Sequence, residues 1–151
     1  MGLSARKLNT FTLFKLPSAW FCGVRVKELN ENSCTVSVKQ RWFNQNPFNS
    51  IFWAVQGMAA ELASGAMLAS KIGDSKKNIS MLVANNKANF SKKARGRIFF
   101  KCEDGHLINK AIDAAILTGE GQTFWMQSIG KDKHDDIVST FDFEWTIKLK
   151  E

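Results

Sequence analysis

A single acidic residue, Glu61, interrupts the longest segment of this chain that could form an apolar helix. The segment runs from Asn49 to Ile72 and carries no other charge before Lys71. Burial among apolar side chains disfavours the charged form of a carboxyl, which raises its pKa and makes it a better general base near neutral pH. Ionisable residues in such positions tend to mark functional sites. Glu61 is therefore our first candidate for a catalytic residue, and a buried structural acid is the alternative.

A cluster of basic residues is the second feature of the sequence that could bind a ligand. The chain has a formal net charge of +7, which favours anionic partners such as phosphate groups. The cluster lacks interleaved exposed aromatic side chains, which argues against nucleic acid as the partner. A solvated strand edge is the alternative for any single member. The densest group of positive charges consists of Lys92, Lys93, Arg95 and Arg97.

The cysteine and histidine content and the lack of long apolar runs narrow the range of protein classes. The three cysteines, Cys22, Cys34 and Cys102, show no CxxC spacing, and with two histidines in the chain we predict reduced thiols and no metal site. Lys15 interrupts the only candidate leader, and no apolar run approaches the ~20 residues of a membrane span. We therefore expect a cytoplasmic protein with no membrane partner.

The segment from Asn49 to Ile72 has the periodicity of one long helix. On a helical wheel Glu61 shares a side with Ala54, Gly57, Met58, Gly65 and Leu68. The polar residues gather on another side: Asn49, Gln56, Ser64, Ser70 and Lys71. This pattern predicts a partly buried carboxylate on a stripe of small, apolar residues.

The sequence predicts mainly β-strands before and after this helix. Alternation and turn residues predict a hairpin, a final strand with one buried face, and a short helix capped by Asp104 and closed by Gly119. A helix that is apolar round most of its circumference must be enclosed, and a curved antiparallel sheet does so economically. We expect one domain over residues 1–151, with about the first 19 as a leading segment. The predicted strands are Phe21–Leu29, Cys34–Phe43, Met81–Phe90, Ala94–Glu103, Thr123–Gly130 and Phe141–Leu149.

This element order and two local motifs resemble the hotdog superfamily of acyl-CoA thioesterases and dehydratases, and within it an uncharacterised thioesterase-like branch. In that branch a loop Asn precedes a Gly-Ser/Thr-x-His helix start, and Ala-Glu-x-Ala-x-Gly follows in mid-helix. Here Asn46 takes the loop position, and Ala60-Glu61-Leu62-Ala63-Ser64-Gly65 matches the mid-helix motif. The segments KKARGRIFF and FDFEWTIKLK are also similar to strands of that branch.

The resemblance implies an α+β hotdog fold, in which a curved antiparallel sheet wraps around one long central helix, in a homodimer or homotetramer. It also implies an acyl-CoA thioester as the ligand, so coenzyme A enters as part of the substrate and no separate cofactor is expected. Glu61 then acts as general base or nucleophile, and Asn46 positions the water or the carbonyl. The basic cluster Lys92, Lys93, Arg95 and Arg97 contacts the coenzyme A phosphates. Amides at the helix start bind the oxyanion, and the positioning residues are Asn49, Ser50, Ile51, Phe52 and Gln56.

The chain departs from the pattern of that branch at two positions. Asn49 stands where Gly is common, and Phe52 stands where the His usually falls. Three hypotheses follow from these observations. The first is an acyl-CoA thioesterase-like protein that binds and hydrolyses a thioester. The second is a catalytically inactive hotdog domain for ligand binding or assembly, which Phe52 favours. The third is an anion- or nucleic-acid-binding module that depends on the basic cluster.

Overall fold

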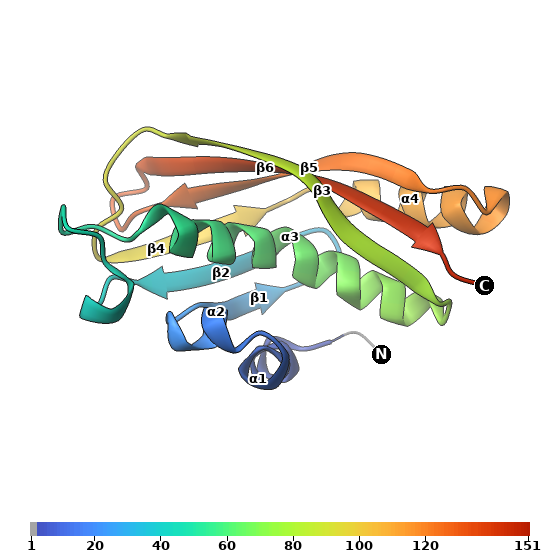
Figure 1. Ribbon diagram of the computed structural model, residues 1–151, viewed down its shortest axis with the longest axis horizontal. Coiled ribbons are helices and arrows are strands. Elements are labelled where there is room, and N and C mark those ends of the chain that lie inside the picture. The colour runs from blue at the N-terminus through green and yellow to red at the C-terminus, as the bar shows by residue number, and fades with distance from the viewer. Residues whose placement is uncertain (1–2) are drawn as a thin grey trace.

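A computed structural model describes residues 3–151, so residues 1–2 of the predicted 1–151 domain lie outside the described part. The described chain forms a six-stranded antiparallel sheet in the order β1-β2-β4-β5-β6-β3. Figure 1 shows the long helix α3 lying along one side of this curved, twisted sheet. The predicted fold class, a curved antiparallel sheet around one long helix, is confirmed. The strands are β1 Arg25–Leu29, β2 Cys34–Lys39, β3 Ile79–Phe90, β4 Arg97–Cys102, β5 Gln122–Lys131 and β6 Ile137–Leu149.

The long helix α3 (Trp53–Ser75) begins four residues after the predicted Asn49 and ends close to Gly73 and Asp74, where the sequence predicts its end. Its start is displaced because the preceding residues are bonded to other loops. Ile51 N–H donates to the carbonyl of Ala94 (2.8 Å) and Phe52 N–H donates to the carbonyl of Asn44 (2.9 Å). At the other end, Lys76 adopts the left-handed conformation (φ 56°) and caps the helix.

The side of α3 that meets the sheet differs from the helical-wheel expectation. Its alanines pack against the sheet, but the polar residues Gln56, Ser64 and Ser70 are buried there too. The sheet supplies hydrogen-bond partners for this face: Ser139 Oγ donates to Gln56 Oε1 (2.8 Å), and Trp145 Nε1 donates to Ser64 Oγ (3.0 Å). Buried polar groups are tolerated when they are paired in this way. Glu61 itself is exposed, but its apolar stripe is not: Leu68 is buried, and Gly57 and Gly65 lie close to Phe141 and Trp145 of β6.

The first residues do not form a simple leading segment. They fold into two helices, α1 (Ala5–Lys15) and α2 (Pro17–Phe21), which Figure 1 shows beside β1 and α3. Ser4 caps α1 by accepting a hydrogen bond from Lys7 N–H (3.3 Å). Asn9 fixes α1 to the sheet, because its side chain donates to the Val26 carbonyl (2.9 Å) and accepts from the Val26 N–H (2.8 Å). A pairing between residues so far apart in sequence leaves no periodic signal.

The other elements follow the sequence more closely. Asn30 closes the β1–β2 turn as expected, and the predicted hairpin is shorter because Phe21 ends α2 and residues 42–44 form the short 3-10 helix η1 (Trp42–Asn44). Helix α4 (Gly105–Thr118) begins after Asp104 and is closed by Gly119, as predicted, but the Asp104 side chain does not cap it and instead accepts a hydrogen bond from Gln127 N–H (2.8 Å). The inward face of β6 is buried through Phe141, Phe143, Trp145 and Ile147. Within residues 3–151, none of the helices combines the length and apolarity that crossing a bilayer requires.

Candidate functional site

An open groove of about 730 Å³ lies at the N-terminus of α3. Two loops form it: the segment before α3, and the segment that connects β3 to β4. They are joined by the hydrogen bond between Ile51 N–H and the Ala94 carbonyl. Aromatic side chains dominate the walls, and the polar groups come from both loops. The groove is lined by Gln45, Asn46, Pro47, Phe48, Ser50, Ile51, Phe52, Trp53, Gln56, Phe90, Ser91, Lys92, Lys93 and Ala94.

Asn46 lines this groove, and its side chain also organises the loop before α3. Its Oδ1 accepts hydrogen bonds from Phe48 N–H (3.0 Å) and Ser50 N–H (3.3 Å), and its Nδ2 donates to Ser50 Oγ (3.0 Å). Such Asx-type bonds replace backbone bonds in a tight turn. The turn-forming interpretation of Asn46 therefore accounts for every hydrogen bond that this side chain makes within the described residues.

The amides at Asn49–Phe52 were the predicted oxyanion donors, but each already donates within the protein. Asn49 N–H donates to the Asn46 carbonyl (3.2 Å), and Ser50 N–H donates to Asn46 Oδ1. Ile51 and Phe52 donate to the neighbouring loops, as described above. Because α3 begins at Trp53, the N–H groups without an intrahelical acceptor are those of Trp53 and Ala54. Of these two residues, Trp53 lines the groove.

The backbone conformation at Asn49 is one that glycine adopts easily, which fits the glycine that is common at this position in the similar branch. Asn49 has a φ of 55°, a left-handed conformation that Gly adopts freely and Asn tolerates better than most residues. Its Oδ1 also accepts a hydrogen bond from Gln40 Nε2 (2.9 Å). We expect Asn49→Val to lower the free energy of unfolding by about 1–3 kcal/mol. Asn49→Gly should leave it nearly unchanged, and urea denaturation of both variants tests this. Equal losses in the two variants would contradict a conformational cause.

Two further predicted positioning residues differ in how accessible they are. Phe52 is partly exposed at the mouth of the groove, edge-on to Trp53 with ring centroids 6.0 Å apart. Gln56, by contrast, is buried, with only 4% of its surface exposed. Its Nε2 donates to the Ile51 carbonyl (3.1 Å), and its Oε1 accepts from Ser139. Gln56 therefore ties the start of α3 to β6 and has no free polar atom to offer a substrate.

Glu61 lies on the outward face of α3, beside a second cavity of about 260 Å³. This cavity extends from α1 and α2, across α3, to Met81 of β3 and Trp145 of β6. Ser18 is the only other polar side chain among its lining residues. The side chain of Glu61 is reachable from solvent, and within residues 3–151 its carboxylate has neither a hydrogen-bond donor nor a basic partner.

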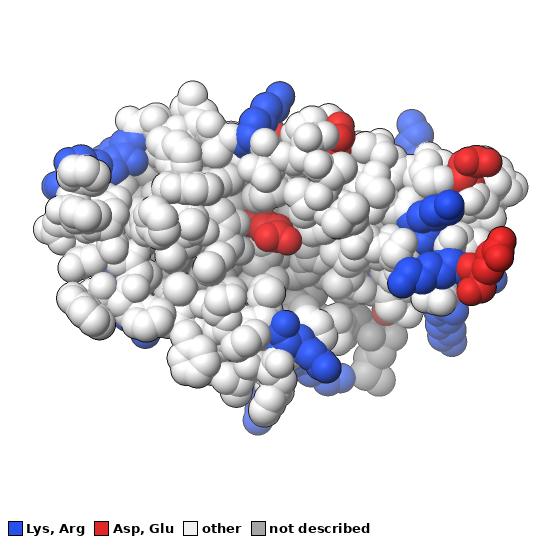
Figure 2. All heavy atoms as spheres, viewed as in Figure 1, with Lys and Arg blue, Asp and Glu red and all other residues white. Residues whose placement is uncertain are grey.

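The apolar surroundings of Glu61 affect its charge. Desolvation by these neighbours raises the pKa of the Glu61 carboxyl above its ordinary value. Figure 2 shows one acidic group near the middle of this face, with uncharged atoms directly around it and the other charged side chains farther away. Glu61 is the only acidic residue of α3 before Asp74. The predicted partial burial of Glu61 is not observed, because its side chain is exposed in an open hollow, but its apolar neighbours still desolvate the carboxyl.

A single chain does not bring the candidate catalytic groups together. Glu61 and Asn46 line different cavities. Glu61 also lies eight residues beyond Trp53, which corresponds to about 12 Å along a helix axis. One substrate carbonyl therefore cannot contact both the Glu61 carboxylate and the Trp53 N–H of the same chain.

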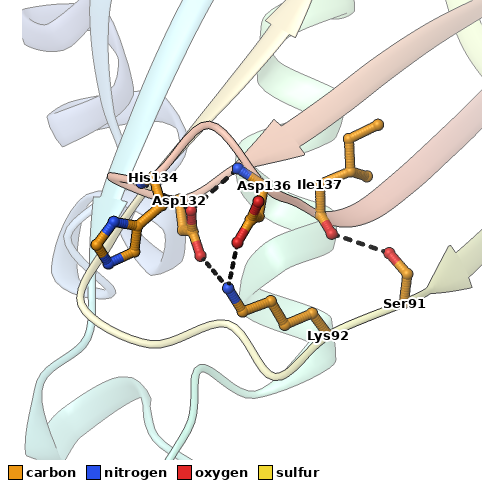
Figure 3. Close-up of polar contacts among 6 residues, drawn as sticks. All are labelled: Ser91, Lys92, Asp132, His134, Asp136 and Ile137. Carbon is orange, nitrogen blue, oxygen red and sulfur yellow. Dashed lines mark hydrogen bonds and ion pairs between the residues drawn. The ribbon is translucent and has the colours of Figure 1, made fainter.

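The basic cluster is also divided. Figure 3 shows the Lys92 ammonium group held between Asp132 and Asp136 of the β5–β6 turn, at 2.7 and 2.8 Å. The hydrogen bond from Lys92 lowers the pKa of Asp132 to about 2, and the same pair of carboxylates raises the pKa of Lys92. The charge of Lys92 is thus balanced within the protein. Its main contribution in this structure is to fasten the β3–β4 loop to that turn.

The other three basic residues point to different places. Arg97 lies on β4, where its Nη1 is 3.4 Å from Ser37 Oγ of β2. Lys93 borders the groove at the start of α3, with its ammonium group 5.9 Å from the centre of the Phe48 ring. Lys93 and Arg95 line a further hollow of about 270 Å³, which also includes Lys92, Asp132, Lys133 and His134. Sequence reasoning missed these last two because they belong to the distant β5–β6 turn.

The structure is similar to solved structures of several bacterial proteins. A protein of unknown function from Pseudomonas aeruginosa, described as a probable thioesterase, superposes with a TM-score of 0.87 at 18% identity, over 99% of both chains. A thioesterase from Haemophilus influenzae gives 0.74 at 12% identity, over 99% of this chain and 93% of the other. The Escherichia coli PaaI protein, from the phenylacetic acid degradation operon, gives 0.67 at 11% identity, over 95% and 92%.

These identities are low, so the similarities establish the fold, which is the hotdog fold of thioesterase-like proteins. No curated protein matches the chain significantly in sequence. The sequence profile of a family described as "Domain of unknown function (DUF4442)" matches residues 4–147. The match includes α1, whose first residue is Ala5, so the N-terminal helices lie within the family's common domain.

Proposed function

The chain belongs to the family described as a domain of unknown function, DUF4442, and from this premise we propose that it is a cytoplasmic acyl-CoA thioesterase. One observation carries the proposal: a solvent-reachable Glu61 carboxyl without a partner, whose pKa is raised by an apolar hollow. An acid buried for structural reasons would be paired, because leaving a buried charged group unpaired has a cost. The thioesterases among the structural neighbours agree with this chemistry, and the three free cysteines agree with a reducing compartment.

The proposed reaction uses two groups, the Glu61 carboxylate of one copy of the chain and the Trp53 N–H of another copy. Ionised Glu61 removes a proton from a water molecule that attacks the thioester carbonyl, or attacks that carbonyl itself. The carbonyl oxygen becomes negative and accepts a hydrogen bond from Trp53 N–H, where the positive end of the α3 dipole adds to its stabilisation. The C–S bond then breaks. On the general-base route protonated Glu61 returns its proton to the leaving thiolate of coenzyme A; on the nucleophilic route the thiolate takes a proton from water, and a second water molecule hydrolyses the acyl–Glu61 anhydride. The Trp53 N–H replaces the Asn49–Phe52 amides of the sequence-based hypothesis.

We propose that the active protein is a homodimer, or a homotetramer of such dimers, in which two chains complete each site. Strand β3 ends the sheet, pairs only with β6 among the described strands, and is twelve residues long. Long open strand edges favour pairing with another chain, and Leu82 and Phe90 expose apolar surface on this edge. Met81 of the same strand lines the Glu61 cavity. Pairing through β3 would therefore place a second chain beside Glu61.

The coenzyme A moiety is proposed to occupy the groove at the start of α3, with its phosphates near Lys93 and Arg95. We expect Lys93→Met and Arg95→Met each to raise the KM for acyl-CoA several-fold, with a smaller effect at high salt, because exposed charge pairs are screened. Lys110→Met is the matched control, since Lys110 is exposed on α4 and does not line the groove. Steady-state kinetics at two ionic strengths test this. An equal rise in KM for all three variants would contradict the assignment.

The decisive test of the activity is a hydrolysis screen with short-chain, long-chain and aromatic acyl-CoA esters, followed by thiol release. Turnover of at least one class supports the proposal. Phe52, which stands where the similar branch has a His, favours one alternative: a ligand-binding domain without catalysis. That alternative predicts no turnover with any ester but saturable binding of acyl-CoA.

A further inference from the structure

The Glu61 cavity is built for an apolar occupant. Helix α1 and the turn after it contribute Leu8, Phe11 and Leu16, and α3 contributes Met58, Leu62 and Ala69. The cavity lining contains no Lys, Arg or Asp, and Glu61 is its one charged residue. A hydrated or charged ligand would lose its hydrogen bonds to water there without replacement. An alkyl chain would lose none.

Apart from the Glu61 carboxylate and the Ser18 hydroxyl, the polar side-chain atoms among the described lining residues are bonded elsewhere. Trp145 presents its ring to the cavity, while its Nε1 donates to Ser64 Oγ inside the protein. The backbone carbonyl of Glu61 accepts a hydrogen bond from Ser64 Oγ (3.0 Å). The Glu61 carboxylate is therefore the only charged group that can meet a ligand here, and it lies on the same apolar wall. This arrangement suits a ligand with one reactive polar group attached to an apolar chain.

We propose that this cavity, enclosed on one side by the α1–α2 segment, is the acyl-chain subsite, and that Phe11 and Ala69 determine the chain length it accepts. The inference rests on the proposed function in that Glu61 meets the thioester carbonyl. The volume of about 260 Å³ is below the roughly 300–1,000 Å³ of pockets that hold whole drug-sized ligands. It therefore fits one part of a ligand, and the larger groove at the start of α3 takes the coenzyme A part.

The first experiment measures binding of neutral 1-alkanols, from butanol to dodecanol, by titration calorimetry. These probes carry an alkyl chain and need neither coenzyme A contacts nor catalysis. Each buried methylene should raise the affinity about fourfold until the cavity is full. In Ala69→Phe the added ring occupies the cavity, so the rise should stop earlier; excluding two methylenes corresponds to about a sixteenfold loss. Ala114→Phe makes the same change on α4, which does not line the cavity, and should bind like the wild type.

A second pair of variants covers the case in which Ala69→Phe does not fold. Phe11 is 57% exposed and lines the cavity, whereas Phe14 of the same helix is 74% exposed and does not line it. Phe11→Ala should weaken binding of long alkanols and leave short ones unaffected, while Phe14→Ala should change neither. Affinity that does not depend on chain length in the wild type, or identical profiles for the two variants, overturns the inference.

The two proposals fail in different ways. If no acyl-CoA ester is hydrolysed but alkanol affinity rises with length and responds to Phe11→Ala, the thioesterase proposal is wrong and the alkyl-chain site stands. If esters are hydrolysed but kcat/KM against chain length is the same in the wild type and Ala69→Phe, the function stands. The acyl chain then lies elsewhere, and the inference is overturned.

Discussion

Glu61→Gln is expected to lower kcat for acyl-CoA hydrolysis by about 10²–10⁴-fold, the usual contribution of a general base. The amide has nearly the same shape as the carboxyl, and the side chain is reachable from solvent, so the fold should be retained. Substrate binding should change little, because the alkyl subsite and the basic residues are intact. Thiol-release kinetics give kcat and KM separately. Glu120→Gln, at an exposed carboxyl beyond α4, is the control and should be fully active.

The same substitution has a consequence for stability with a definite sign. The pKa of Glu61 is raised above its ordinary 4.5 in the folded protein, so the folded chain binds this proton more tightly than the unfolded chain. Wild-type stability therefore falls relative to Glu61→Gln as the pH rises from that ordinary value through the raised pKa. The two proteins should unfold alike in acid, and the Gln variant should be the more stable near neutral pH. Denaturation at several pH values measures this difference.

The pH dependence of the wild-type reaction links the two effects. Only ionised Glu61 acts as a base, so kcat should fall on the acid side at a pH above the ordinary glutamate range. Full activity of Glu61→Gln, or an acid limb at the ordinary glutamate pKa, would remove Glu61 from the chemistry. Loss of activity together with loss of folded structure would instead indicate a structural acid.

The sequence predicted the elements of the sheet well because their signals are local. The alternation from Phe141 to Leu149 appears directly as the buried and exposed faces of β6. Gly119 ends α4 in a left-handed conformation, because C-capping depends on the residue next to the helix. Helix α1 was missed because its attachment is non-local: Asn9 bonds to Val26, seventeen residues away. A helix that depends on one such contact has little periodicity of its own.

In the candidate site, too, local features could be predicted from the sequence and contacts between distant residues could not. The unusual carboxyl of Glu61 is visible in sequence because a charge inside an apolar segment is a local anomaly. Which face of α3 is outward is not visible, because it depends on Ser139 and Trp145 of β6, which satisfy Gln56 and Ser64 across the core. The pairing of Lys92 with the β5–β6 turn was hidden for the same reason. Local rules identified the reactive group, and tertiary partners decided what surrounds it.

Trp53→Pro is expected to lower kcat by about 10²–10³-fold, the usual cost of removing one oxyanion donor. Proline has no N–H, yet it is favoured at the first position of a helix, which Trp53 occupies. The preceding Phe52 has φ −57° and ψ 136°, a conformation that a following proline permits. Trp53→Ala separates the ring from the amide, because it keeps the N–H and should retain most of the activity. Circular dichroism checks that both variants keep α3.

Mixing the two inactive variants tests whether the site is shared between chains. A Glu61→Gln chain keeps its Trp53 N–H, and a Trp53→Pro chain keeps its Glu61 carboxylate. In a twofold-symmetric dimer whose sites each take one group from either chain, a mixed dimer contains one intact site and one doubly impaired site. Since random exchange makes half of the dimers mixed, about a quarter of wild-type activity should return. If both groups act within one chain, the mixture stays inactive. That result would contradict the distance argument, because the two turns of α3 between Trp53 and Glu61 separate the groups too widely for one carbonyl.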